Sequence, residues 1–120
     1  MKDSSRATIA YIAGRVINNS KSSSVYDYSK SKHINISGEI NTKQVNVYNY
    51  EKGCHFSGNR SRSNYSIYNY GDGCHISLEI NGKNFSGYDY GSSSHFSGSV
   101  SNNSISLYDY EHSIHFNYTI

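Results

Sequence analysis

The chain of 120 residues repeats one unit five times. Each copy reads Tyr-(Asp/Asn)-Tyr, then four spacer residues, then His followed by Ile or Phe. The copies begin at Tyr26, Tyr48, Tyr68, Tyr88 and Tyr108, so the spacings are 22, 20, 20 and 20 residues. A fixed period in this range is typical of architectures that stack one supersecondary unit on another. The repeat therefore constrains the fold much more than it constrains any chemistry.

Each repeat predicts two short strands in an all-β protein. Apolar and small polar residues alternate before the first tyrosine, and again from the histidine onward, as in His75-Ile76-Ser77-Leu78. Because strand side chains alternate between two faces, the Asp/Asn residues share a face with the aliphatic residues, and both tyrosines lie on the opposite face. Phe56 and Phe96 are each followed two residues later by Gly, which indicates volume compensation in a packed interior.

The repeats divide the chain into segments of a single repeat domain over residues 1–120. We expect a cap at 1–10, a half repeat at 11–25, and full repeats at 26–47, 48–67, 68–87, 88–107 and 108–120. The half repeat rests on the match between residues 12–16 and residues 36–40. This division predicts about eleven short strands. In the cap, a helical turn after Ser5 and a strand both fit the sequence.

Two architectures fit the repeats. A parallel β-solenoid places equivalent residues about 4.8 Å apart, whereas an antiparallel meander or barrel of hairpins places them about 9.5 Å apart. Asn81-Gly82 is typical of a hairpin turn and favours the meander. We favour the solenoid (β-helix), because it closes a core within each coil and stacks the Asp/Asn residues in a ladder. A barrel of this many strands has a wide interior that few large side chains could fill.

The tyrosines and histidines of the repeats are the candidate binding surface. They are Tyr26, Tyr28, His33, Tyr48, Tyr50, His55, Tyr68, Tyr70, His75, Tyr88, Tyr90, His95, Tyr108, Tyr110 and His115. An exposed aromatic strip of this size indicates binding of another copy of the chain, a glycan or a protein surface. The alternative interpretation is that the rings only stabilise the sheet through cross-strand pairs. We expect a non-catalytic structural or binding protein that self-associates as a homo-oligomer, with a carbohydrate-binding module as the alternative.

A weaker alternative is a metal-binding protein that uses Cys54, His55, Cys74 and His75, with His112 as a further ligand, because thiols and imidazoles suit zinc. Each Cys is adjacent to its His, however, and adjacent strand residues point to opposite faces. The two cysteines also test the fold, since only a solenoid brings them close enough for a disulfide.

Other function classes have little support in the sequence. In every repeat the Asp/Asn residue lies on the face opposite the histidine, so we expect no catalytic relay and no cofactor. The 11 basic and 9 acidic residues are scattered, which argues against nucleic acid. The apolar stretch at residues 7–13 is too short to span a membrane and makes a poor secretory segment, so the default expectation is a cytoplasmic chain.

Overall fold

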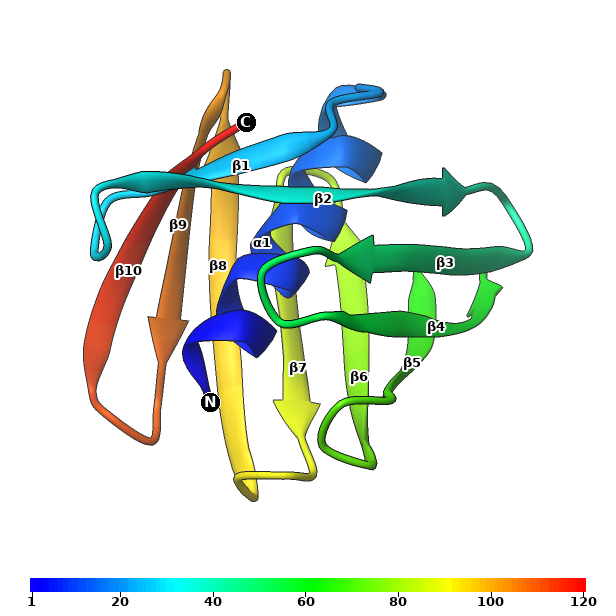
Figure 1. Cartoon of the computed structure of the whole chain (residues 1–120). Helices are drawn as coiled ribbons and strands as arrows, with labels where there is room; N and C mark the ends of the chain where they lie inside the picture. The colour runs from blue at the N-terminus through cyan, green and yellow to red at the C-terminus, as the bar shows by residue number, and fades with distance from the viewer.

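Ten antiparallel strands follow one another around a closed barrel in this computed structural model, which describes all 120 residues (Figure 1). One helix, α1 (Asp3–Asn18), precedes them. The strands are β1 (Ser24–Asp27), β2 (Lys32–Ile40), β3 (Gln44–Asn49), β4 (Cys54–Ser61), β5 (Asn64–Asn69), β6 (Cys74–Asn81), β7 (Asn84–Asp89), β8 (Ser94–Ser101), β9 (Ser104–Asp109) and β10 (Ile114–Thr119). Each strand pairs with its neighbours in sequence, and β1 pairs with β10 to close the barrel.

The all-β prediction is confirmed, and the predicted parallel solenoid is wrong. The chain forms the alternative that we held open, a barrel of hairpin repeats, in which equivalent residues lie two strands apart. The half repeat expected at residues 11–25 is also wrong, because the chain is helical to Asn18 and the first strand begins only at Ser24. The barrel therefore has ten strands, one fewer than predicted.

Helix α1 lies inside the barrel and fills it. Its residues from Ser5 to Gly14 are all buried, and its side chains reach strands on several sides of the wall. Thr8 accepts a hydrogen bond from Asn49 of β3, and Ser5 accepts one from Asn69 of β5. Ten tilted strands enclose a barrel roughly 20 Å across between backbones. A helix about 10 Å wide fits that space, so the interior needs few large side chains from the strands.

The Asp/Asn residue of each repeat forms the turn that follows its first strand. At one end of the barrel, five four-residue turns join the two strands of each repeat, as between Asn49 and Cys54. In all five, the Asp/Asn side chain accepts a hydrogen bond from the backbone N–H two residues later, at 2.9–3.0 Å. Asp and Asn favour this local bond, which explains why they recur at this position.

At the opposite end, two-residue turns join β4 to β5, β6 to β7 and β8 to β9. The hairpin predicted from Asn81-Gly82 is present, but its turn residues are Gly82 and Lys83, because Asn81 pairs with Asn84. The sequence therefore located the turn to within one residue.

The small volume of glycine compensates for the large volume of phenylalanine on the neighbouring strand, rather than along the same strand. Phe85 pairs with Gly98, and Gly87 pairs with Phe96. A Cβ atom at Gly98 would lie 2.4 Å from the ring of Phe85, so only glycine leaves room for the ring. Three of the four phenylalanines, Phe56, Phe85 and Phe96, are buried, and Phe116 is partly buried against the same core. The prediction that this face forms the core is confirmed.

The first repeat is out of step with the other four. Asn69, Asp89 and Asp109 each pair with the residue that follows the histidine of the previous repeat. Asn49 and Asp27 instead pair two residues further along, with Ile36 and Tyr118. The hairpin of the first repeat is therefore displaced by about 7 Å against both neighbours.

No helix in the chain has the length and apolar character needed to cross a membrane.

Candidate functional site

The tyrosines and the histidine of each repeat form one aromatic trio on the outer surface of the barrel. The first tyrosine lies at the end of a strand and pairs directly with the histidine on the next strand, as Tyr68 does with His75. The second tyrosine is the first residue of the four-residue turn, and its ring packs on the first, as Tyr70 does on Tyr68. Each trio is therefore held by a strand pair and a turn of its own repeat.

The five trios have nearly the same geometry. The ring centroids lie 4.7–4.9 Å apart in every tyrosine pair and in every tyrosine–histidine pair, and the planes meet at 62–83°. Edge-to-face contacts of this kind are favourable beyond the area that they bury. The second tyrosine of each trio stays 54–61% exposed. The rings thus stabilise one another and also present a rigid aromatic surface to solvent.

Together the fifteen residues form a band around the barrel, which we call the Tyr/His belt. In repeats 3 to 5 the backbone N–H of the second tyrosine donates to the carbonyl of the previous histidine, as Tyr90 does to His75. In repeats 1 and 2, Tyr28 and Tyr50 donate instead to Asn117 and Asn35. The belt is therefore continuous from repeat 2 to repeat 5 and stepped at the first repeat. The sequence predicted that these residues form an exposed aromatic strip, but it did not predict the step at the first repeat.

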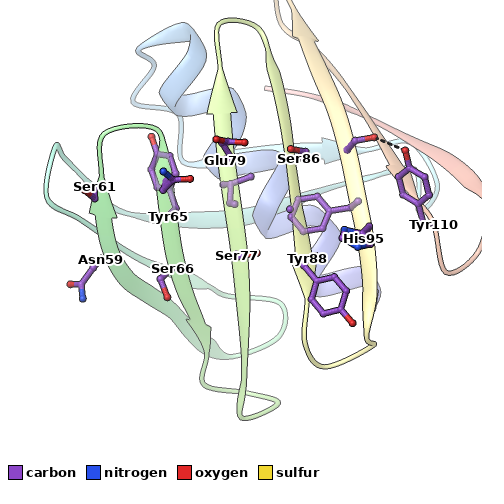
Figure 2. A pocket seen from close by; sticks show the side chains of 15 residues that line it. Asn59, Ser61, Tyr65, Ser66, Ser77, Glu79, Ser86, Tyr88, His95 and Tyr110 are labelled. Carbon is purple, nitrogen blue, oxygen red and sulfur yellow. Dashed lines mark hydrogen bonds between the residues drawn. The ribbon is translucent and has the colours of Figure 1, made fainter.

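A groove of about 800 Å³ lies beside the belt on the outer wall, along β4 to β8 (Figure 2). Tyr88, His95 and Tyr110 border it at the belt side, and the hydroxyl groups of Tyr110 and Ser97 lie 3.4 Å apart. Its floor carries short polar side chains, namely Ser66, Ser77, Ser86 and Ser97. These serines occupy the outward positions next to the belt on successive strands. The sequence shows them as repeated small residues, but no sequence signal marked them as a groove.

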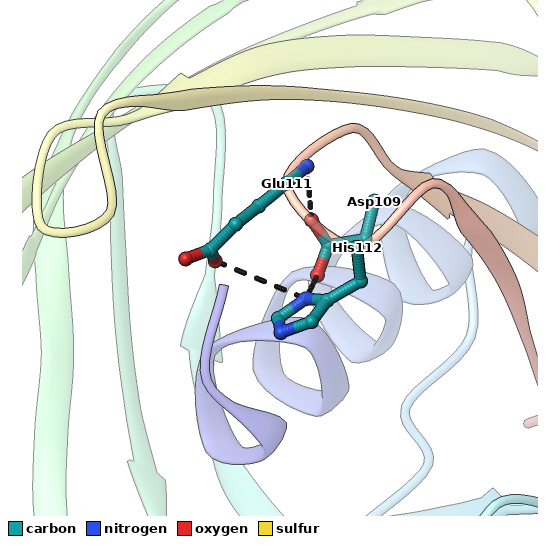
Figure 3. Close-up of side chains that lie close together, drawn as sticks. All are labelled: Asp109, Glu111 and His112. Carbon is teal, nitrogen blue, oxygen red and sulfur yellow. Dashed lines mark hydrogen bonds and ion pairs between the residues drawn. The ribbon is translucent and has the colours of Figure 1, made fainter.

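A second cluster of polar groups lies at the end of the barrel where the helix begins. Asp109 is fully buried and receives hydrogen bonds from Arg6 of the helix at 2.9 Å and from the amino group of Met1 at 3.3 Å. His112 lies 2.8 Å from the same carboxylate (Figure 3). Burial by itself raises the pKa of Asp109, but the hydrogen bond with His112 and the positive charge of the amine outweigh it, so the pKa lies below its usual range.

Asp109, Glu111 and His112 are the one group whose ligand atoms lie close enough together to hold a metal ion, within 4.8 Å. Arg6 and the Met1 amine already neutralise these carboxylates, so the cluster acts as an ion-pair network that anchors the helix. The alternative metal site at Cys54, His55, Cys74 and His75 is not assembled. The two cysteines lie on β4 and β6, which β5 separates.

The barrel wall separates the acidic residues of the repeats from the histidines. The five Asp/Asn side chains are buried inside, whereas the five histidines are exposed outside. A relay that pairs the acid and the base of one repeat is therefore geometrically impossible. No protein-family model, curated protein or solved structure matches the chain.

Proposed function

We propose that this chain is a non-catalytic binding protein and that the Tyr/His belt is its binding surface. One observation carries the proposal: the same trio recurs five times with its second tyrosine more than half exposed. Tyrosine provides a large amphipathic contact area and has few rotatable bonds. The exposed second tyrosine packs edge-to-face on the first tyrosine of its trio, so it loses less freedom on binding than an isolated ring, which lowers the entropic cost of a complex.

A second copy of the chain is the occupant that we propose for the belt. Neighbouring trios of repeats 2 to 5 lie two strands apart on the convex wall, so a second barrel can contact the exposed rings of adjacent trios at once. Exposed aromatic patches that extend over several residues mark interaction surfaces in soluble proteins. Self-contact between identical patches gives symmetric dimers, which are the commonest oligomers.

The experiment compares the wild-type chain with a variant in which Tyr50, Tyr70, Tyr90 and Tyr110 are replaced by serine. We expect the wild type to scatter light as a multiple of its 13.5 kDa mass at high micromolar concentration, and the variant to be monomeric. A matched control replaces the exposed residues Asn46, Asn64 and Asn84, on the same outer wall, by serine. A monomeric wild type would contradict the proposal that a second copy binds the belt. Association of the tyrosine variant would contradict the proposal that the belt is the surface of self-association.

A further inference from the structure

We infer that the groove beside Tyr88, His95 and Tyr110 is a binding site for a neutral polysaccharide chain. This inference shares one premise with the proposed function, that belt tyrosines bind a ligand, and it does not depend on self-association. It rests on four features of the groove, namely its shape, its hydroxyl groups, its aromatic border and its charge.

The groove has the shape of a track for a chain. Its lining runs from Asn59 on β4 to His95 and Ser97 on β8, across five neighbouring strands (Figure 2). With adjacent strands about 4.8 Å apart, this span is roughly 19 Å. A site for a single sugar ring needs far less length. The groove also crosses the strands, so an extended ligand would meet a new set of outward side chains at each strand.

The chemistry of the lining suits a sugar, which has hydroxyl groups at its edges and apolar patches of C–H on its faces. The serine hydroxyls at 66, 77, 86 and 97 both donate and accept hydrogen bonds. Two core side chains, Leu78 and Phe96, also border the groove between these short residues.

The charge of the groove selects against anionic ligands. None of its fifteen lining residues is Lys or Arg, and Glu79 contributes one carboxylate. Sulfated, phosphorylated and uronic-acid chains therefore find no Lys or Arg partner there, and Glu79 repels them. The same carboxylate can accept hydrogen bonds from neutral sugar hydroxyls. Neutral polysaccharides are the class that fits.

The track continues around the wall beyond the first groove. A second hollow shares Glu79, Ser86 and Ser97 with it and adds Tyr108 and His115. A third shares Ser99 and Ser106 with the second and ends beside Tyr28. Each hollow combines serines with a tyrosine of the belt. A longer chain would therefore contact more of the track than a short oligosaccharide.

Affinity electrophoresis tests this site on the full chain. The probes are galactomannan, mixed-linkage β-glucan, dextran and pullulan as neutral polysaccharides, with alginate and heparin as anionic ones. We expect migration to be retarded by at least one neutral polysaccharide and by neither anionic one. Titration calorimetry with oligosaccharides of the retarding polymer should show tighter binding as the chain lengthens from two to six sugar units.

Two matched pairs of variants locate the binding. Tyr110 and Tyr50 are both second tyrosines of a trio, and each hydroxyl lies 3.4 Å from a serine, but only Tyr110 borders the groove. We expect Tyr110→Ala to weaken binding about tenfold, through loss of an aromatic contact with the ligand, and Tyr50→Ala to leave it unchanged. Ser77→Leu should block the floor, whereas Ser57→Leu, at the equivalent outward position two strands away, should not.

Each outcome is decisive. Retardation by no neutral polysaccharide, equal binding of alginate or heparin, or equal effects within either matched pair would overturn the inference. If the wild type binds no polysaccharide but self-associates through the belt, the inference fails while the proposed function stands. If belt-dependent self-association is also absent, both fail.

Discussion

At the scale of single residues, Asp109 carries more interactions than its place in the repeat requires. Its Oδ1 atom accepts the N–H of Glu111, which is the same turn bond made by the other four Asp/Asn residues. Its Oδ2 atom additionally meets Arg6, His112 and the Met1 amine. The guanidinium of Arg6 also lies 3.8 Å from the centre of the Phe116 ring. One repeat has thus acquired the charge network that fixes the start of the helix.

Replacing this carboxylate separates the two roles. Asp109→Asn keeps an amide oxygen for the turn, as Asn49 and Asn69 do, but leaves the buried Arg6 without its main counter-charge. We expect a loss of about 3 kcal/mol in the free energy of unfolding, measured with urea. Asp89→Asn is the matched control, because Asp89 bonds only the turn N–H and the Ser92 hydroxyl, and it should cost less than about 1 kcal/mol. Equal losses would contradict this assignment.

The same network predicts sensitivity to acid. Because the folded-state pKa of Asp109 is lowered, its ionised form stabilises the folded protein, and this contribution is fully present above the ordinary carboxyl pKa of about 4. The contribution is lost as the pH falls from there through the lowered folded value. Urea unfolding measured between pH 7 and pH 2 should therefore show a steeper decline below pH 4 for the wild type than for Asp109→Asn. Parallel curves would contradict the prediction.

At the scale of the elements, the last residue of each four-residue turn adopts a left-handed backbone. Gly53 and Gly73 have φ angles of 76° and 68°, and Ser31, Ser93 and Ser113 adopt φ angles of 52–55° at the same position. This conformation is strained for a residue with a Cβ atom. Ser93→Gly relieves this strain in the folded state but also gives the unfolded chain more conformational freedom. We expect the relief to exceed the entropic loss, so that the variant is more stable by about 0.5 kcal/mol in thermal or urea unfolding. Ser93→Ala keeps the Cβ and should bring no such gain.

The cysteines give a test of strand order. Cys54 and Cys74 start β4 and β6, two strand spacings apart across β5 and offset by two residues along the strands, so they lie roughly 12 Å apart, beyond the reach of a disulfide. Burial is the main cause that raises the pKa of both thiols, so they also react slowly. Mild oxidation of the native protein should leave two titratable thiols per monomer. An intramolecular disulfide that forms without loss of the circular dichroism spectrum would contradict the barrel.

Much of each hairpin could be predicted from the sequence. Alternation of side chains placed Asp27 and its equivalents inside, and it placed the tyrosines and histidines outside. The sequence predicted at most one helical turn after Ser5, because residues 12–16 match residues 36–40 and so indicated a strand of a half repeat. The informative property of residues 7–13 is a mixture of small and apolar residues on every side, as expected of a helix that is buried all round. No sequence signal marks the groove, because it depends on which serines the barrel brings together.

At the scale of the whole molecule, the helix decides between the two architectures. A hollow ten-stranded barrel would be unstable, and for that reason the sequence, with its few large apolar residues, favours the solenoid. With α1 in the centre, the helix and the inward strand residues form one cluster of 24 buried hydrophobic side chains. The interior that counted against the barrel is filled by a segment outside the repeats. The repeats alone therefore do not determine the fold.

The closed wall leaves little space for larger side chains on the helix, and substitutions at Gly14 test this. A Cβ atom there would lie 2.7 Å from the Cδ1 atom of Ile105 and 3.1 Å from that of Ile120. Gly14→Ala should be nearly neutral, since these flexible methyl ends can shift slightly and alanine favours the helix by about 1 kcal/mol. Gly14→Leu should lower the free energy of unfolding by about 3 kcal/mol, because a barrel hydrogen-bonded all round cannot open at one edge to admit the larger side chain. Urea unfolding of the two variants measures the difference. If Gly14→Leu were as stable as Gly14→Ala, the helix could not be enclosed by the wall, since a helix packed on an open sheet would simply move outward.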